Sequence, residues 1–346
     1  MMQGKGVVFV TGDRLGEQLT VLLEEAGCQV IRGPQPNPPA LTTFPREEWP
    51  RLFGETDVIV VSPREVCSKE VMLAAPRLRA VVAAVIGVDT IDMDAANDMG
   101  LIVGHGAMPE NYEGVAEATV MLIAALLLDL PGKQTLLRTN APRPAQMRAR
   151  MVRGRTIGLI GMGRTARGVV ERLAGWGVTL QSYDPYVSQE HAPPGVTMID
   201  LPTLLHTSDV VSVHVTLTAE TRHFLGEAAL RLMRSDAYLV NTSRGAVIDE
   251  QALSRVLKDK GISGAALDVF EQEPLPPESL LRELDNVILT PHMIGHSREL
   301  MAAIPPTAAE NVLRVLRGES PLYVKNPEIL PAWRQRLAAL DRRSGG

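Results

Sequence analysis

The sequence predicts an α/β fold of two doubly wound parallel-sheet domains, and three observations support this prediction. The chain has 346 residues, whereas a single hydrophobic core seldom grows beyond about 250–300 residues. Short runs rich in Val and Ile alternate with amphipathic stretches along the chain, which is typical of buried parallel strands in βαβ units. In the second half, helical patterns lie between most of the strands, as in a sheet covered on both faces.

The predicted strands form two series. The first comprises Val7–Val10, Asp57–Val61, Leu78–Val85 and Leu101–Val103. The second comprises Thr156–Ile160, Val178–Tyr183, Asp209–Val215, Ala237–Asn241, Ala265–Val269 and Val287–Leu289. Because the Pro- and Arg-rich stretch 131–155 between them predicts an exposed connection, we expect each series to form its own sheet.

Helices are predicted where apolar residues recur at helical spacing. The clearest cover Glu17–Glu24, the apolar run Val115–Leu130, and Arg298–Gly318, in which Pro305 and Pro306 predict a kink. After this last helix, Ser320–Gly346 mixes Pro, Arg and Gly and is expected to be a tail.

Composition excludes several classes of protein. A net charge of −5 without a basic stripe gives no reason to expect a nucleic-acid partner. No signal-peptide pattern is present, and Val115–Leu130 carries Glu117 and Asp129 and is shorter than the roughly 20 residues of a membrane span. Cys28 and Cys67 are too few for a disulfide framework and lack metal-ligand spacing. We therefore expect a cytoplasmic protein that binds no metal, no nucleic acid and no membrane.

The first chemical motif is a glycine-rich turn. Gly161, Gly163 and Ala166 form the pattern Gly-x-Gly-x-x-Ala directly after the strand Thr156–Ile160, at the start of a helix that runs to Ala174. The first glycine allows a tight turn, the second lets the backbone approach a pyrophosphate, and the helix N-terminus offers free amides to the phosphates. The position between a strand and a helix makes this a dinucleotide-binding motif.

Asp184 follows the next predicted strand, 23 residues after Gly161. A carboxylate there hydrogen-bonds the adenosine ribose hydroxyls and repels a 2′-phosphate. The alternative is a surface Asp in a turn. The motif and this Asp together predict a Rossmann domain that binds NAD in preference to NADP.

Three polar residues stand just past three later strands, where ligands bind in such sheets. They are Arg244, Glu273 and His292. A guanidinium matches a carboxylate with two hydrogen bonds, and a histidine oriented by a carboxylate can exchange a proton near neutral pH. Each has an ordinary alternative, such as a surface Arg, a loop Glu or a capping His, but all three together favour a catalytic group.

Four segments resemble the D-isomer-specific 2-hydroxyacid dehydrogenase family: GLIGMGR at 158–164, VNTSRGAVIDE at 240–250, ALDVFEQEP at 266–274 and LTPHMIG at 289–295. Further similar segments are 86–92, 111–119 and 326–328, so the resemblance covers nearly the whole chain. It implies a Rossmann-like NAD-binding domain, 129–295, inserted in a flavodoxin-like substrate-binding domain, 1–128 and 296–346. It also implies NAD-dependent interconversion of a small D-2-hydroxy acid and its 2-oxo acid, of glyoxylate, hydroxypyruvate or phosphoglycerate type, by a homodimer.

The resemblance also implies roles for individual residues. Arg244, Glu273 and His292 would be the catalytic residues. The cofactor would contact Gly161, Gly163, Arg164, Thr165, Asp184, His214, Thr216, Thr242, Asp268, Thr119 and Gly295. Asp268 would lie near the nicotinamide carboxamide. The substrate would contact Ile86, Gly87, Asn111 and Arg64, the last of these being a solvated side chain in the alternative interpretation.

Some features depart from the family pattern. Thr216 stands where the family usually has Pro, and 140–153 lacks the Trp common in a region that often contributes to the dimer surface. His105 and His296 are additional histidines that either face the pocket or are ordinary loop residues.

The alternatives to a 2-hydroxyacid dehydrogenase are an enzyme that oxidises formate or phosphite and a protein that binds NAD without turnover. Formate-oxidising members carry Gln at the position of Glu273, and phosphite-oxidising members carry Lys at that of Ile86. An NAD-sensing corepressor or scaffold on the same fold is the alternative from another class, and the lack of long low-complexity tails argues against it.

Overall fold

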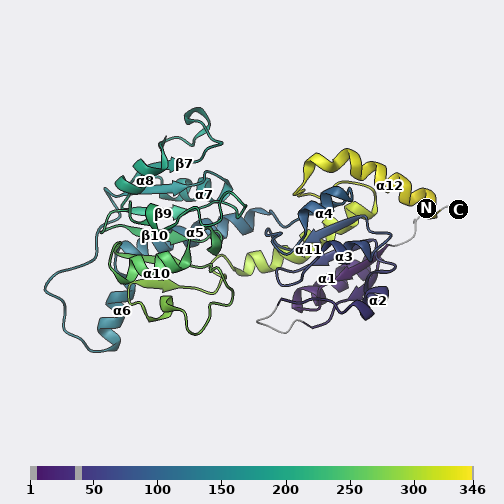
Figure 1. Cartoon of the computed structure of the whole chain (residues 1–346), viewed down its shortest axis with the longest axis horizontal. Coiled ribbons are helices and arrows are strands. Elements are labelled where there is room, and N and C mark those ends of the chain that lie inside the picture. Colours follow the sequence, from purple (N-terminus) through teal and green to yellow (C-terminus); the bar gives the residue numbers. More distant parts are fainter. Residues whose placement is uncertain (1–5, 36–40, 345–346) are drawn as a thin grey trace. The chain divides into compact units, whose positions relative to one another are not determined.

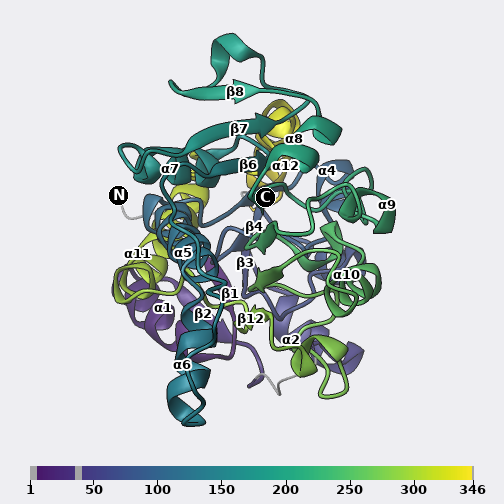
Figure 2. The same cartoon turned by 90° about the vertical axis from the view of Figure 1, so that its left-hand side faces the viewer.

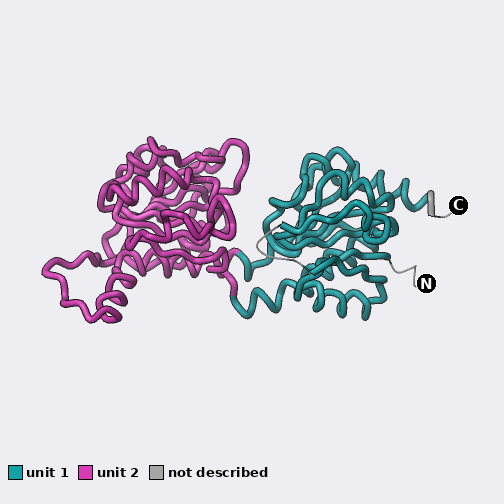
Figure 3. Tube along the Cα trace, turned by 60° about the horizontal axis from the view of Figure 1, so that its bottom comes forward, with its two compact units in different colours: residues 1–111, 297–346 teal, residues 112–296 magenta. Residues whose placement is uncertain are grey.

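The computed structural model describes residues 6–35 and 41–344. The chain forms two compact units, which Figure 3 shows in different colours. Unit 1 comprises Met1–Asn111 and Ser297–Gly346, and unit 2 comprises Tyr112–His296. Unit 2 is therefore a continuous segment inserted between the two parts of unit 1.

Unit 1 is a doubly wound parallel sheet with strand order β2-β1-β3-β4-β5. Its strands are β1 (Val7–Val10), β2 (Gln29–Arg32), β3 (Val58–Val61), β4 (Ala80–Ala83) and β5 (Ile102–Gly104), and its helices are α1 (Arg14–Glu25), α2 (Trp49–Phe53), α3 (Lys69–Leu73), α4 (Met93–Asp98), α11 (Arg298–Leu316) and α12 (Leu330–Ser344). Alternate side chains of β3 enter two separate cores, because Val58 and Val60 pack with α1 and α11 whereas Ile59 and Val61 pack with Phe9 and Phe53. Figure 1 labels the helices of this unit.

Unit 2 contains a larger parallel sheet with strand order β12-β11-β10-β9-β6-β7-β8. Its strands are β6 (Thr156–Ile160), β7 (Thr179–Tyr183), β8 (Val196–Met198), β9 (Val210–Val213), β10 (Tyr238–Asn241), β11 (Gly264–Leu267) and β12 (Val287–Leu289), and its helices are α5 (Pro109–Leu127), α6 (Leu130–Arg138), α7 (Arg164–Leu173), α8 (Leu201–Thr207), α9 (Glu227–Leu230) and α10 (Glu250–Lys258). Figure 2 shows β6, β7 and β8 side by side. The predicted fold class of two doubly wound parallel sheets is confirmed.

Several details differ from the sequence prediction. The segment 320–346 is not only a tail, because α12 buries Trp333, Leu337 and Leu340 against unit 1. The connection 131–155 begins with α6, most of whose side chains are exposed. The helix α11 continues through both prolines from Arg298 to Leu316. The edge strands β2 and β8 were not predicted.

The division between the units lies at Asn111, at the start of α5, whereas the crossover was expected near residue 128. The physical reason is that α5 packs on the sheet of unit 2, where Ile123 and Leu127 share a core with Ile157 and Leu159 of β6. On the return, the division follows His296. In the part of the chain that is described, no single helix is long and apolar enough to cross a membrane, and only α5 and α6 taken together, with a bend of 61° between them, pass that test.

Candidate active site

The glycine-rich turn connects β6 to α7 in unit 2. Gly161 has φ +92°, and a Cβ there would lie 2.8 Å from the carbonyl oxygen of His214, so glycine is required both for the conformation and for the close approach. Gly163 is the N-cap residue of α7, and a Cβ there would meet no atom within 4 Å. Open space before the first amides of a helix fits a pyrophosphate, so these residues fit the phosphate-binding turn of a dinucleotide site.

Asp184 lies directly after β7, beside this turn. Its Oδ2 accepts a hydrogen bond of 2.8 Å from the amide of Met162, and its Oδ1 accepts one of 2.9 Å from the amide of Tyr186. The carboxylate is thus tied to the residue between the two glycines. This geometry suits a group that binds a ribose close to the phosphates.

His214 and Thr216 follow the neighbouring strand β9. The Nε2 of His214 lies 2.9 Å from the Oγ of Ser212. Burial lowers the pKa of His214 to about 4, so the imidazole is neutral at physiological pH. Thr216 is exposed, and its carbonyl accepts a hydrogen bond of 2.7 Å from the Oγ1 of Thr221.

Five other predicted cofactor residues lie on α5, on α7 and in the loops after β10 and β12. The Oγ1 of Thr119, a buried residue of α5, lies 3.0 Å from the Oγ1 of Thr242, which follows β10. The guanidinium of Arg164 lies over the ring of Tyr112, 5.9 Å from its centre. A Cβ at Gly295 would lie 2.6 Å from the Cγ2 of Val115, so the loop after His292 approaches α5 closely. Thr165 lies in the first turn of α7.

Glu273 and His292 form a hydrogen-bonded pair. The Nδ1 of His292 lies 2.7 Å from the Oε2 of Glu273, and the Oε1 of Glu273 accepts a hydrogen bond of 3.1 Å from the amide of Phe270. Burial opposes ionisation of Glu273, but the hydrogen bond and charge of His292, the Phe270 amide and the charge of Arg244 outweigh it and lower the pKa of Glu273. The pair therefore holds an ionised carboxylate against one nitrogen of the imidazole.

Arg244 lies three residues beyond the end of β10, in a loop braced by Asn241. The Nδ2 of Asn241 donates a hydrogen bond of 3.0 Å to the carbonyl of Arg244, and the Oδ1 of Asn241 accepts one of 3.0 Å from the amide of Ser243. The Nη1 of Arg244 donates to the carbonyl of Ser243 at 2.8 Å. The backbone beside Arg244 approaches the Glu273 loop, since a Cβ at Gly245 would lie 1.9 Å from the carbonyl carbon of Phe270, and the charge of Arg244 contributes to lowering the pKa of Glu273.

Asp268 supports the loop that carries His292. Its buried Oδ1 accepts hydrogen bonds from the Oγ1 of Thr290 at 2.7 Å and from the amides of Met293 at 3.0 Å and Ile294 at 3.2 Å. His292 lies between these donors with φ +56°, a left-handed conformation that non-glycine residues adopt only where the surroundings impose it. Thr290 is thus a supporting residue that the sequence analysis did not single out.

The predicted substrate residues belong to the first part of the chain. Ile86 and Gly87 lie in the turn after β4. The Nδ1 of His105 lies 3.1 Å from the carbonyl oxygen of Ile86. Arg64 is exposed after β3, and Asn111 is half-buried in the first turn of α5. The roles of Ile86, Gly87, Asn111 and Arg64 as substrate contacts stay predictions.

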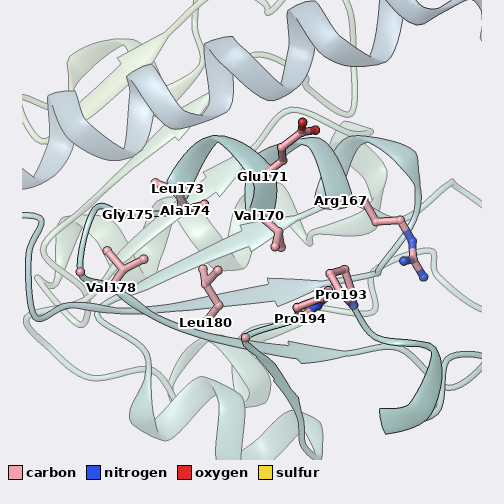
Figure 4. A pocket seen from close by; sticks show the side chains of 12 residues that line it. Arg167, Val170, Glu171, Leu173, Ala174, Gly175, Val178, Leu180, Pro193 and Pro194 are labelled. Atoms are coloured by element: carbon pink, nitrogen blue, oxygen red, sulfur yellow. The ribbon is translucent and has the colours of Figure 1, made fainter.

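A groove of about 590 Å³ lies in unit 2 between α7, β7 and the turn at Pro193–Gly195. Figure 4 shows Val170, Leu173, Leu180 and Pro194 among its lining side chains. None of the predicted site residues lines it. The described residues also contain no group of three or more His, Cys, Asp or Glu side chains that could hold a metal ion.

A doubly wound sheet with this glycine turn, and with an Arg and a Glu–His pair beyond its strands, defines a nucleotide-binding oxidoreductase domain. Residues 120–294 match the profile of the D-isomer specific 2-hydroxyacid dehydrogenase NAD binding domain. The chain belongs to this family. It is an NAD-dependent D-2-hydroxyacid dehydrogenase, so the resemblance, the class of enzyme and the cofactor expected from the sequence are confirmed.

Named relatives agree with this membership. The chain is 38% identical to a glyoxylate reductase of Thermofilum pendens over 317 residues, which are 89% of this chain and 91% of the relative. It is 35% identical to a D-3-phosphoglycerate dehydrogenase of Methanocaldococcus jannaschii, over 94% of this chain but only 60% of that longer protein. The structure of an Aquifex aeolicus D-lactate dehydrogenase complexed with NAD and lactic acid superposes with a TM-score of 0.80 and 27% identity, over 90% of this chain and 96% of that one.

Proposed function

We propose that this enzyme interconverts a small D-2-hydroxy acid and its 2-oxo acid, of the glyoxylate, hydroxypyruvate or phosphoglycerate type, with NAD(H). The names of the relatives support this substrate class. The observation that carries the proposal is the 2.7 Å contact between the Nδ1 of His292 and the Oε2 of Glu273. The corepressor alternative receives no support from the relatives.

Each catalytic residue has one task in this proposal. Arg244 binds the substrate carboxylate through its planar guanidinium and polarises the adjacent carbonyl. His292, whose Nδ1 is held by Glu273, gives a proton from Nε2 to the carbonyl oxygen in reduction and takes it back in oxidation. Bound NADH supplies the hydride that reduces C2. Glu273 stays ionised and stabilises the imidazolium that exists before proton transfer.

The remaining contacts belong to the same proposal. The glycine turn and the first amides of α7 would hold the pyrophosphate, and Asp184 would hold the ribose and disfavour a 2′-phosphate. Arg164, Thr165, His214, Thr216, Thr242, Thr119, Asp268 and Gly295 would complete the cofactor site. The amides of Ile86 and Gly87, with Asn111 and Arg64, would contribute substrate contacts.

A substrate panel tests the proposal. Glyoxylate, hydroxypyruvate, 3-phosphohydroxypyruvate, pyruvate, phenylpyruvate and branched 2-oxo acids would each be assayed with NADH and NADPH at 340 nm. We expect the highest kcat/KM with a small acid and NADH, and the D-enantiomer as product. His292→Asn is the matched control, because Asn tolerates the left-handed conformation of this residue. It should bind NADH and turn over none of the acids, and a parent enzyme that reduces none of them would refute the proposal.

We further propose a cytoplasmic homodimer that uses the arm formed by α6 and the following loop. Leu137, Met147 and Met151 on this arm are 84%, 65% and 68% exposed, and this segment is therefore where an apolar interface would form. Light scattering should give twice the monomer mass. A Leu137→Asp variant should shift the mass towards the monomer, and a parent protein that is monomeric at micromolar concentration would contradict the dimer.

A further inference from the structure

The loop that carries Glu273 is held to α10 by two further carboxylates, those of Glu250 and Glu271. The amide of Glu250, the first residue of α10, donates a hydrogen bond of 2.9 Å to the Oε1 of Glu271. In return, the amide of Glu271 donates one of 2.9 Å to the Oε2 of Glu250. Each glutamate therefore binds the backbone of the other, although 21 residues separate them.

His223 joins this arrangement from a third segment. Its Nε2 lies 3.0 Å from the Oε1 of Glu271, the same oxygen that accepts from Glu250. Its amide donates a hydrogen bond of 2.8 Å to the carbonyl of Ala246, and its backbone has φ +52°. We call Glu250, Glu271 and His223 the glutamate clasp.

The glutamate clasp joins the two segments that carry Arg244 and Glu273. Arg244 lies six residues before Glu250, and Glu273 lies two residues after Glu271. The same segments also approach closely at Gly245, where a Cβ would lie 1.9 Å from the carbonyl carbon of Phe270. Since the amide of Phe270 donates to Glu273, any movement of this loop changes the position of the carboxylate that holds His292.

The carboxylates of the glutamate clasp repel each other and Glu273, and the neighbouring hydrogen-bond donors offset this repulsion. Burial, with the negative charges of Glu271 and Glu273, raises the pKa of Glu250 against the lowering effect of the Glu271 amide. Glu250 and Glu271 place two further carboxylates beside Glu273, and like charges repel. The amide donors and His223 offset this repulsion.

We propose that Glu271, held by Glu250 and His223, is a positioning residue. It places the Glu273 carboxylate against His292 and fixes the position of that carboxylate relative to Arg244. The inference rests on the proposed function, because it assigns Glu271 a part in the proton transfer made by His292. Glu271 touches neither substrate nor cofactor in this assignment.

Glu271→Ala tests the inference through kinetics. Displacing a catalytic pair by about 1 Å can cost about 100-fold in rate, so we expect kcat for 2-oxo acid reduction to fall about 10- to 100-fold. NADH affinity, measured by fluorescence, should stay within about twofold, because the Glu271 loop lies apart from the phosphate-binding turn. The alkaline limb of the pH profile of kcat should move to lower pH, because a displaced Glu273 carboxylate stabilises the imidazolium of His292 less. A purely structural role would lower the melting temperature and leave this limb in place.

Two further variants separate positioning from general damage. Glu271→Gln keeps the size and one acceptor oxygen, and it should recover most of the lost kcat. Glu227→Ala is the matched control, because Glu227 also bonds to α10, through Arg255 at 2.9 Å, and its second partner is Arg231 at the end of its own helix α9, at 2.8 Å. It should leave kcat and the pH profile as in the parent.

A double-mutant cycle with Glu273→Gln decides the matter. If Glu271 acts through Glu273, Glu271→Ala should cost less than about twofold when added to Glu273→Gln, since contacting residues are not additive. Fully additive losses, or a Glu271→Ala enzyme with parental kcat and pH profile, would overturn the inference. Failure of the proposed function looks different, because the parent itself would then reduce no 2-oxo acid.

Discussion

Removing the charge of Glu273 while keeping its shape isolates its effect on the proton donor. In the Glu273→Gln variant, the side chain retains an acceptor for one of its two partners, the amide of Phe270 or the Nδ1 of His292. Reduction needs a protonated His292, so its rate falls on the alkaline side of the profile. Loss of the carboxylate destabilises the imidazolium, and this alkaline limb should therefore move to lower pH.

The size of the shift follows from the geometry. At the 2.7 Å contact between Nδ1 and Oε2, unit charges in a water-like dielectric would attract by about 1.5 kcal/mol. The two side chains are 44% and 34% exposed, and in such partly exposed pairs the side-chain entropy lost on pairing offsets part of the attraction and leaves about 1 kcal/mol. Because 1.36 kcal/mol corresponds to one pH unit, the limb should move by about 0.5–1 unit.

The assay is kcat/KM for 2-oxo acid reduction between pH 5 and 10 for the parent and Glu273→Gln, with the reverse oxidation in parallel. Oxidation needs neutral His292, so it should become possible at lower pH in the variant. NADH binding serves as the control for correct folding. An unmoved limb, or one that moves to higher pH, would show that Glu273 does not support the proton donor.

Three other substitutions test the site. Asp184→Ala should narrow the preference for NADH, and comparable kcat/KM for NADH and NADPH in the parent would refute the role of Asp184. Arg244→Lys keeps the positive charge but removes the planar guanidinium, and it should lower kcat/KM about 30- to 1,000-fold with NADH affinity nearly unchanged. A near-parental kcat/KM would exclude Arg244 as the ligand of the substrate carboxylate. Gly161→Ala places a Cβ 2.8 Å from the carbonyl oxygen of His214 at φ +92°. It should lower the unfolding free energy by about 1–3 kcal/mol, measured by chemical denaturation, and weaken NADH binding, measured by fluorescence titration. A variant with parental stability and parental NADH affinity would contradict this account.

The strands β1 and β3 were predictable because they are uninterrupted, fully buried runs of Val, Ile and Phe. The bounds predicted for β6 and β12 agree with the structure at both ends. The edge strand β2 was missed because Gln29–Arg32 mixes polar and apolar residues, none of them fully buried. In α12, the spacing of Trp333, Leu337 and Leu340 was the available helical signal, and the surrounding Arg and Pro obscured it.

The site was predictable only in part. Strand ends placed Arg244, Glu273 and His292 at one edge of a sheet, and chemistry suggested their pairing. The hydrogen bonds of Asp268 to the loop after β12, and those between Glu250 and Glu271, join residues more than 20 positions apart through tertiary packing. No local pattern in the sequence indicates such partners.

The insertion of one unit into the other has a consequence for biosynthesis. All strands of unit 2 have been made once residue 296 leaves the ribosome, so this unit can fold while translation continues. The sheet of unit 1, made first, must wait for α11, because Ile304 and Val312 cover the face that presents Val58 and Val60. The earliest strands of the nascent chain therefore keep an apolar surface exposed until α11 has been synthesised, long after the strands themselves.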